Sequence, residues 1–155
     1  MRARISWTTL GVIVAAALLA AQADPRVGTW NLNVEKSKYS PGPAPKSQVL
    51  TIEAAGDAEK VTSESVSATG QKSSTTYTAP YDGKPHPLKG SEIADTVTLK
   101  RVDSHTTERV DSKAGKSVQT YSRVVSKDGK TMTVTVKGTD AKGQAVSNVV
   151  VFEKK

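Results

Sequence analysis

"TMTVTVKG", residues Thr131 to Gly138, alternates polar and apolar side chains over its first six positions. Met132, Val134 and Val136 fall on one face of an extended chain and the threonines fall on the other, because successive side chains of a β-strand point to opposite sides. The run is shorter than most helices and its period of two is that of a strand. The stretch therefore predicts a β-strand with one buried face.

The same alternation of Val, Thr, Ile or Leu with polar residues recurs along most of the chain after residue 23. Short clusters that contain Gly, Asp or Lys separate the runs, and such residues supply the backbone conformations of tight hairpins. No segment there longer than eight residues has helical periodicity. The sequence predicts about ten strands, at residues 28–35, 47–55, 59–68, 72–79, 84–88, 95–102, 105–112, 117–125, 131–138 and 145–153.

The topology follows from the short turns. Tight turns make neighbours in the sequence neighbours in the sheet, which indicates an antiparallel meander. Ten such strands in one open sheet would leave two edges for aggregation, and the twist of the sheet would curl it. We therefore predict an all-β fold, an up-and-down antiparallel β-barrel of about ten strands, because closure removes both edges. A two-sheet β-sandwich is the alternative.

Residues 1–23 have the features of a secretory signal peptide. Two arginines precede an apolar run from Leu10 to Ala20, and the sequence Ala-Gln-Ala follows it. The apolar run is about half of the roughly 20 residues that a membrane helix needs. We expect cleavage before Asp24, a single barrel domain at residues 24–155 with no membrane span after cleavage, and a periplasmic or extracellular location.

The composition argues against several classes of protein. The chain has no cysteine to form a disulfide or to carry a lipid anchor. Its net charge of +7 is spread over many lysines, whereas nucleic-acid binding needs positive charge gathered on one face. His86 and His105, the only histidines, do not have the spacing of metal ligands. We expect no nucleic acid, no metal, no cofactor and no enzymatic activity.

Two groups of prolines interrupt the strands. Pro41, Pro43 and Pro45 alternate with small residues, which predicts an extended, polyproline-like segment that crosses one end of the barrel as a lid. Pro85 and Pro87 are two residues apart, so that both missing N–H groups lie on the same edge of their strand. We expect a weak seam between the fourth and fifth strands, at which water or a ligand could enter.

Several features together have the pattern of a known superfamily. They are Gly-Thr-Trp at residues 28–30 on the first strand, about ten meandering strands, a gap between the fourth and fifth strands, and a last strand that reads NVVVFEKK at residues 148–155. In these features the chain resembles the calycin superfamily, which includes the lipocalins and the fatty-acid-binding proteins, and it is similar to secreted bacterial proteins of lipocalin-like type. The resemblance implies a barrel that holds a small apolar or amphipathic molecule.

The chain also departs from the fatty-acid-binding proteins in two ways. Its last strand contains no arginine, whereas those proteins carry an Arg-x-Tyr pair there that holds a carboxylate. The proline segment stands where those proteins have a pair of helices between the first two strands. The resemblance therefore implies a fold and a kind of binding, and it does not identify the ligand.

Four side chains are candidates for contact with a ligand. Tyr121 and Arg123 are two residues apart, so they share a strand face, and if it points inward they could together bind a carboxylate or phosphate. Both faces of this strand carry valines, so the opposite face could equally point inward. Arg101 shares a face with apolar residues but stands near a strand end, where it could reach water. Tyr77 shares its strand face with Thr75 and Ala79, which is more typical of a core position than of a ligand contact. Trp30 is expected to close the base of the barrel.

Three functions are compatible with these features. The first is a binding protein whose barrel holds a small apolar or amphipathic molecule. The second is a structural or interaction protein whose barrel is filled by its own side chains. The third is an enzyme or a haem protein on the same barrel, with His86 and His105 as the available axial ligands. An aromatic content of 5% favours the first, because few bulky side chains remain to fill the interior.

Overall fold

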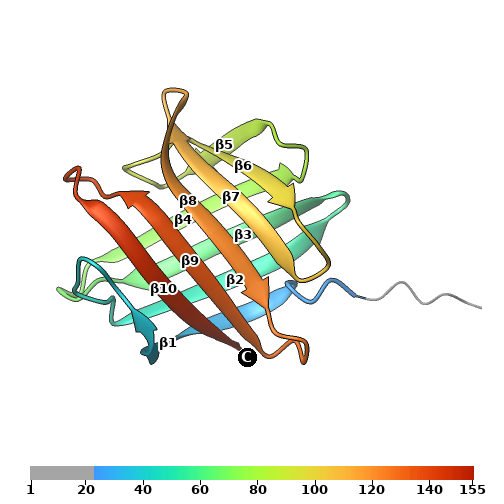
Figure 1. The fold of residues 1–155 in the computed structure, drawn as a ribbon, viewed down its shortest axis with the longest axis horizontal. Coiled ribbons are helices and arrows are strands. Elements are labelled where there is room, and N and C mark those ends of the chain that lie inside the picture. Colours follow the sequence, from blue (N-terminus) through green and yellow to red (C-terminus); the bar gives the residue numbers. More distant parts are fainter. Residues whose placement is uncertain (1–22) are drawn as a thin grey trace, which may run out of the picture.

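The computed structural model describes residues 23–155, so the signal peptide predicted at residues 1–23 lies, except for Ala23, outside the described residues. Ten strands follow one another along the chain (Figure 1). Nowhere in residues 23–155 is there a helix with the length and apolarity to cross a membrane. The strands are β1 (Gly28–Lys38), β2 (Ser47–Ala55), β3 (Ala58–Val66), β4 (Lys72–Pro80), β5 (Pro85–Lys89), β6 (Thr96–Arg101), β7 (Thr106–Lys113), β8 (Lys116–Val125), β9 (Thr131–Thr139) and β10 (Ala145–Lys154).

The ten strands close into one antiparallel barrel. Each strand from β2 to β10 pairs with its neighbour in the sequence, and β1 pairs with both β2 and β10. Trp30 of β1 lies opposite Lys154 of β10, and Figure 1 shows the two ends of the described chain running side by side. The prediction of an up-and-down barrel is therefore confirmed, and the alternative of a two-sheet sandwich is wrong.

The strand bounds agree with the alternation in the sequence to within three residues. The largest difference lies in β1, which continues to Lys38 after an irregular stretch that begins at Asn33. In this stretch Ser37 Oγ donates to the Asn33 carbonyl (2.6 Å) and accepts a hydrogen bond from the Val151 amide (2.9 Å). A side chain thus replaces a backbone partner, which a pattern of alternating side chains does not reveal.

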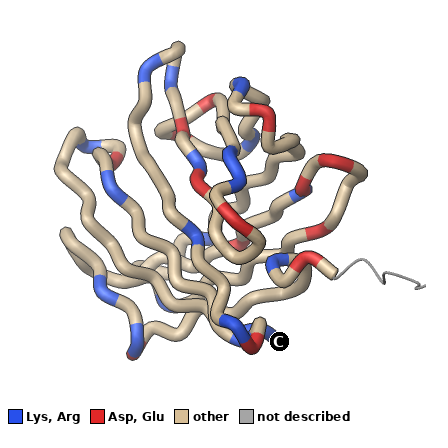
Figure 2. The backbone as a smooth tube through the Cα atoms, turned by 45° about the vertical axis from the view of Figure 1, so that its right-hand side comes forward, with Lys and Arg blue, Asp and Glu red and all other residues tan. Residues whose placement is uncertain are grey.

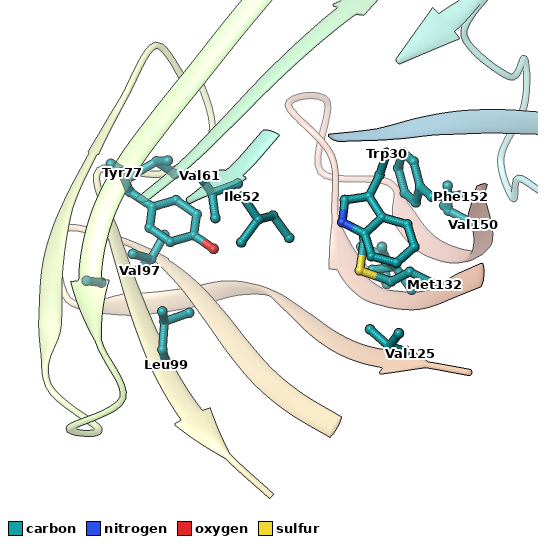
Figure 3. Packing of buried hydrophobic residues seen from close by; sticks show 14 of the residues in the cluster. Trp30, Ile52, Val61, Tyr77, Val97, Leu99, Val125, Met132, Val150 and Phe152 are labelled. Carbon is teal, nitrogen blue, oxygen red and sulfur yellow. The ribbon is translucent and has the colours of Figure 1, made fainter. Parts of the chain in front are cut away.

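One end of the barrel, which we call the floor, is closed by apolar side chains. Trp30 is fully buried there with Met132 and Phe152 (Figure 3). Its indole Nε1 donates a hydrogen bond to the Arg26 carbonyl (2.8 Å), so that the segment before β1 is held against the floor. The predicted position of Trp30 at the base of the barrel is confirmed.

The opposite end of the barrel, which we call the mouth, is crossed by the proline segment, residues 39–46. Ser40 fixes this segment to β10, because its amide donates to Asn148 Oδ1 (2.9 Å) and its carbonyl accepts from the Ser147 amide (2.7 Å). The segment connects β1 to β2 without taking part in their ladder, since proline has no N–H group to donate. The predicted position of the segment at one end of the barrel is confirmed, and its role as a lid stays a prediction.

The ladder between β4 and β5 is the shortest in the barrel, with only two paired positions. The Leu88 amide donates to the carbonyl of Asp95, which precedes β6, so the alternate residues Pro85 and Pro87 turn their nitrogens toward β4. On the facing strand, β4 ends in Pro80. Because none of these prolines has an N–H group, the ladder cannot continue toward the floor. The predicted seam is confirmed.

Replacement of Trp30 by alanine is expected to lower the free energy of unfolding by about 3–5 kcal/mol, because it leaves a cavity in the floor of a closed barrel. Urea unfolding followed by circular dichroism measures the change. Val124→Ala is the control, since Val124 is 44% exposed on the outer face of β8 and its loss should cost less than about 0.5 kcal/mol. Equal losses in the two variants would contradict the role of Trp30 in the floor.

Candidate functional site

Charged and polar side chains occupy much of the interior between the floor and the mouth. Along the backbone, positions of Lys and Arg are interspersed with positions of Asp and Glu over strands and turns (Figure 2). The interior polar side chains come from inward positions of four strands, β3, β4, β7 and β8, which makes this interior unlike an ordinary apolar core. They are Glu59, Tyr77, Thr107, Arg109, Asp111, Gln119, Tyr121 and Arg123.

An ion pair between Glu59 and Arg123 crosses the interior. Arg123 Nη2 lies 2.5 Å from Glu59 Oε1, and the two side chains are only 5% and 4% exposed. The strand that carries Arg123, β8, and the strand that carries Glu59, β3, are five places apart in the ring of ten. The pair therefore joins opposite walls. Because burial costs several kcal/mol per ion, such a pair needs further hydrogen bonds to its charged groups.

Hydroxyl groups supply these hydrogen bonds. Tyr77 donates to Glu59 Oε1 (2.7 Å), Tyr81 donates to Oε2 (2.5 Å), and Arg123 Nε donates to Thr107 Oγ1 (3.1 Å). Burial alone would raise the pKa of Glu59, but the charge of Arg123 and these hydrogen bonds outweigh burial and hold the pKa below its usual value. Burial raises the pKa of Tyr77 to about 12, so its hydroxyl remains a donor at neutral pH.

A second ion pair lies nearer the mouth. Arg109 donates from Nε and Nη2 to the two carboxylate oxygens of Asp111, each at 2.6 Å. Its guanidinium also lies over the rings of Tyr77, at 4.8 Å, and Tyr121, at 4.6 Å. The Arg109 side chain is 16% exposed, and its Nη1 makes no hydrogen bond with residues 23–155. Arg109 is thus held on three sides and has a donor to spare.

At the floor, Asp24 links two arginines. Its Oδ2 accepts hydrogen bonds from Arg26 Nη2 (2.8 Å) and from Arg101 Nη2 (3.2 Å). The Arg101 guanidinium lies 4.3 Å from the centre of the Tyr81 ring, and its side chain is 42% exposed. Arg26 is fully buried. The segment before β1 therefore adds charged groups to the closed end of the barrel.

A cavity of about 460 Å³ opens at the mouth beside the proline segment. Its lining mixes apolar and polar side chains, among them Tyr39, Gln119, Val146 and Asn148. Gln119 connects the cavity to the interior, because its Oε1 accepts a hydrogen bond from the Tyr121 hydroxyl (2.5 Å). Burial raises the pKa of Tyr39 to about 12, and its hydroxyl has no hydrogen-bond partner within residues 23–155. The mixed lining suits a molecule with both a polar and an apolar part.

A second cavity, of about 350 Å³, lies along the seam between β4 and β5. Lys60, Thr78, Pro87 and Lys89 line it on the outer side, and the inward residue Tyr77 lines it as well. The missing ladder bonds thus bring the outer surface close to the ring on which Arg109 stacks.

The structure places Tyr121 and Arg123 on the inward face, since Arg123 is buried and the next residue, Val124, is 44% exposed. The sequence left open which face of this strand points inward, and in the structure it is the face of Tyr121 and Arg123. The two side chains do not converge on one point, however, because Arg123 is bound by Glu59 and the Tyr121 hydroxyl donates to Gln119. The expected joint phenol and guanidinium site is therefore not formed by this pair alone.

The other two candidates lie at different levels of the barrel. Tyr77 is 4% exposed and belongs to the packed interior as well as to the hydrogen-bond network, in line with its expected place in the core. Arg101 is the last residue of β6 and its side chain reaches water at the floor, as its position near a strand end predicted. It does not line the interior near Arg109.

Three charged residues of the interior were missed by the sequence reasoning: Glu59, Arg109 and Asp111. The alternation of side chains along the strands contained a signal for them. Glu59 is two residues from Val61, which is buried, so the two share the inward face. Arg109 and Asp111 alternate with Val110, which points outward. The valine made the outward face of β7 look like the apolar one. These side chains can point inward because each is paired with an opposite charge, Glu59 with Arg123 across the interior and Arg109 with Asp111 on the same strand.

The histidines do not take part in this network. His86 Nε2 lies 3.0 Å from Asp82 Oδ1, and His105 Nδ1 forms a hydrogen bond of 2.9 Å with Ser104 Oγ. Among the described residues, no three His, Cys, Asp or Glu side chains are grouped as a metal ion would require.

Comparison with known proteins identifies the fold. The chain is similar to the crystal structure of zebrafish ileal bile acid-binding protein complexed with cholic acid, with a TM-score of 0.51 and 14% sequence identity over 84% of this chain and 99% of that chain. No family model matches the sequence, and no curated protein matches it either. The structural likeness shows a calycin-like barrel, as the resemblance in the sequence implied.

The substitution Glu59→Gln is expected to destabilise the protein by about 3–5 kcal/mol, because it leaves the buried Arg123 without a counter-charge. Urea unfolding measures the loss. The double variant Glu59→Gln with Arg123→Met should recover most of it, since no unpaired charge remains and the Gln carbonyl still accepts from Tyr77. A double variant as unstable as the single variant would show that the ion pair itself is not the cause.

The pH dependence of stability should also report on Glu59. A carboxyl group with a lowered pKa in the folded state stabilises the fold above its unfolded pKa and loses that effect as the pH falls through the folded pKa. We expect the free energy of unfolding to fall more steeply between pH 5 and pH 3 in the natural protein than in the Glu59→Gln, Arg123→Met variant. Urea midpoints across this range test it, and parallel curves would contradict it.

Proposed function

We propose that this protein binds a small amphipathic molecule in the mouth half of its barrel, with a polar group that accepts hydrogen bonds placed against Arg109. The observation that carries the proposal is the setting of Arg109. Its guanidinium is stacked on two tyrosine rings, is fixed by Asp111, and retains an unused Nη1. A fixed donor beside an aromatic surface is the combination that orients a ligand with a polar and an apolar part.

The mouth half of the interior offers space for the apolar part. The inward side chains Leu32, Leu50 and Tyr121 are only partly buried, whereas Trp30 and Met132 at the floor are fully buried. Asp111 and Gln119 nearer the mouth are themselves buried, while the partly buried Leu32 and Tyr121 leave apolar surface that a ligand could contact. An apolar chain in contact with these residues would gain about 25 cal/mol for each Å² of apolar surface removed from water.

The head group has a defined position. In the β7–β8 ladder Asp111 lies opposite Gln119, which lines the mouth cavity, and Arg109 lies one step deeper. Asp111 occupies two nitrogens of Arg109, so the guanidinium keeps its orientation when a ligand approaches the third. Because the two ion pairs of the interior balance in charge, the head group need not be anionic. A carboxylate or a hydroxyl fits Arg109, and an ammonium group does not.

The structural likeness supports this proposal. The similar zebrafish protein is a bile acid-binding protein complexed with cholic acid, which is itself an amphipathic carboxylic acid. We propose binding rather than catalysis, and a periplasmic or extracellular setting, which rests on the signal peptide predicted at residues 1–23. The proline segment then serves as the cover of the ligand entrance.

A barrel filled by its own side chains is the second candidate. The floor and the pair of Glu59 and Arg123 already fill the deeper half of the interior. If the mouth half also closes on itself, the protein would offer only its outer surface to a partner. The two candidates differ in one measurable property, which is uptake of a ligand.

Binding of dodecanoate, dodecanol and dodecylamine tests the head group. Dodecanoate and dodecanol should displace a fluorescent fatty acid from the barrel, and dodecylamine should not, because its ammonium group donates hydrogen bonds and is repelled by Arg109. Arg109→Lys keeps the charge beside Asp111 and loses the guanidinium fork. It should weaken dodecanoate binding about tenfold or more, since a charge-assisted hydrogen bond contributes about 1.5–3 kcal/mol.

Arg101→Lys is the matched control, because Arg101 lies at the floor and its variant should bind dodecanoate like the natural protein. Titration calorimetry gives the affinities. Absence of binding for all three molecules would favour the self-filled barrel, and equal binding of all three would remove Arg109 from the site.

A further inference from the structure

A cavity of about 360 Å³ opens beside the floor, at the end of the barrel away from the mouth. We call it the floor cavity, and residues 23–25, 101, 104–105 and 127–129 line it. Hydrogen bonds hold its walls in place. The Val125 amide at the end of β8 donates to the His105 carbonyl in the β6–β7 turn (2.9 Å), and Lys154 Nζ donates to the Pro25 carbonyl (3.0 Å). The volume lies in the range of small-molecule sites, roughly 300–1,000 Å³.

The two carboxylates of the floor cavity already have partners within the chain. Asp24 Oδ2 accepts hydrogen bonds from Arg26 Nη2 (2.8 Å) and Arg101 Nη2 (3.2 Å). Asp128 Oδ1 accepts from the Ser126 hydroxyl (2.6 Å), and this hydrogen bond holds the pKa of Asp128 below its usual value. These acceptors therefore serve the neighbouring side chains before they can serve a ligand.

Three nitrogen-bearing side chains of the floor cavity keep donors in reserve. Arg101 gives only its Nη2 to Asp24, so its Nη1 has no partner within residues 23–155, and the ring of Tyr81, 4.3 Å from its guanidinium, fixes the orientation. His105 uses only Nδ1, in a hydrogen bond within its own turn, and Nε2 remains. Lys127 is exposed on the β8–β9 turn. The cavity thus offers donors from two different turns and from the end of β6.

The charges at the floor cavity also favour an anion. Arg26, which is paired with Asp24 behind the cavity wall, adds to the positive charges of Arg101 and Lys127. The negative charges are those of Asp24 and Asp128. Three positive charges against two negative charges leave an excess of one, before any proton on the histidine is counted.

We propose that the floor cavity binds a sulfate or phosphate group carried by a small polar molecule. A monoester of either acid has three terminal oxygens, one for each of Arg101, His105 and Lys127, whereas a carboxylate has only two. The cavity is also larger than a tetrahedral ion alone requires, so the remaining space receives the molecule that carries the group. The site lies at the opposite end of the barrel from the ligand position proposed at Arg109, and it does not depend on that proposal.

Titration calorimetry at low and constant ionic strength tests the site with glucose 6-sulfate, inorganic sulfate and glucose. We expect glucose 6-sulfate to bind more tightly than inorganic sulfate, because the sugar adds contacts in the cavity, and glucose not to bind, because it lacks the charge. Equal binding of the two anions would overturn the assignment to an ester. Absence of binding for both anions would overturn the site.

Variants locate the binding. Arg101→Met should weaken glucose 6-sulfate binding about tenfold or more, because it removes a charge-assisted hydrogen bond. Lys127→Gln should weaken it about threefold, because Lys127 is exposed and its charge is screened by water. Lys116→Gln is the matched control of equal charge change, since Lys116 is exposed at the first position of β8, near the mouth. Equal losses in Lys116→Gln and Lys127→Gln would overturn the assignment to the floor cavity.

The two histidines report on the same site in the natural protein. His105 lines the floor cavity, whereas His86 lies on β5 beside Asp82. Glucose 6-sulfate should shift the NMR signals of the His105 imidazole and leave those of His86 in place, and a shift of both or of neither would contradict the proposal. Arg109→Lys, which is expected to weaken dodecanoate binding, should leave glucose 6-sulfate binding unchanged. Failure of either proposal therefore leaves the other standing.

Discussion

The buried ion pair between Glu59 and Arg123 is the constraint on which the interior depends. It joins opposite walls of the barrel, and its two residues are 64 positions apart in the sequence. A shift of either strand by one residue would turn its charge to the outside and leave the other charge buried alone, a loss of several kcal/mol. The pair therefore selects one register for β3 and β8, and through the ladders it constrains the strands between them. Tyr77, Tyr81 and Thr107 complete the arrangement by satisfying its remaining hydrogen-bonding groups.

This pair also divides the barrel by depth. Toward the floor Trp30 is fully buried, and toward the mouth Tyr121 is partly exposed although Asp111 and Gln119 are buried. A molecule that enters past the proline segment meets the aromatic rings around Arg109 before it reaches the Glu59 carboxylate. In the proposed binding mode the ligand thus ends above these charged side chains, and the floor has its own separate charges. A substitution near Arg109 at the mouth should therefore leave the ion pairs of Asp24 at the floor unchanged, and the reverse also holds.

Much of the fold could be predicted from the sequence, because it depends on local signals. Alternation in stretches such as residues 131–138 gave the strands, and the turn residues gave their order. The proline segment and the seam could be located because proline acts on the backbone wherever it stands. The candidate site was harder to predict, because the sequence indicated Tyr121 and Arg123 but not the residues that they bind. Glu59 acts through Arg123, which is distant in the sequence, and in β7, which carries the pair of Arg109 and Asp111, the alternation of charge with valine concealed which face is buried.

The three prolines at the seam also affect how the barrel could pair with a second copy of the chain. A closed barrel that opens briefly does so where its ladder is shortest, between β4 and β5. The two edges released there contain Pro80, Pro85 and Pro87, which offer no N–H groups to a second copy of the chain. The weakest line of the cylinder is therefore also the line least able to recruit a neighbour into a growing sheet. The same three pyrrolidine rings thus shorten the ladder and remove the donors with which a second copy could pair.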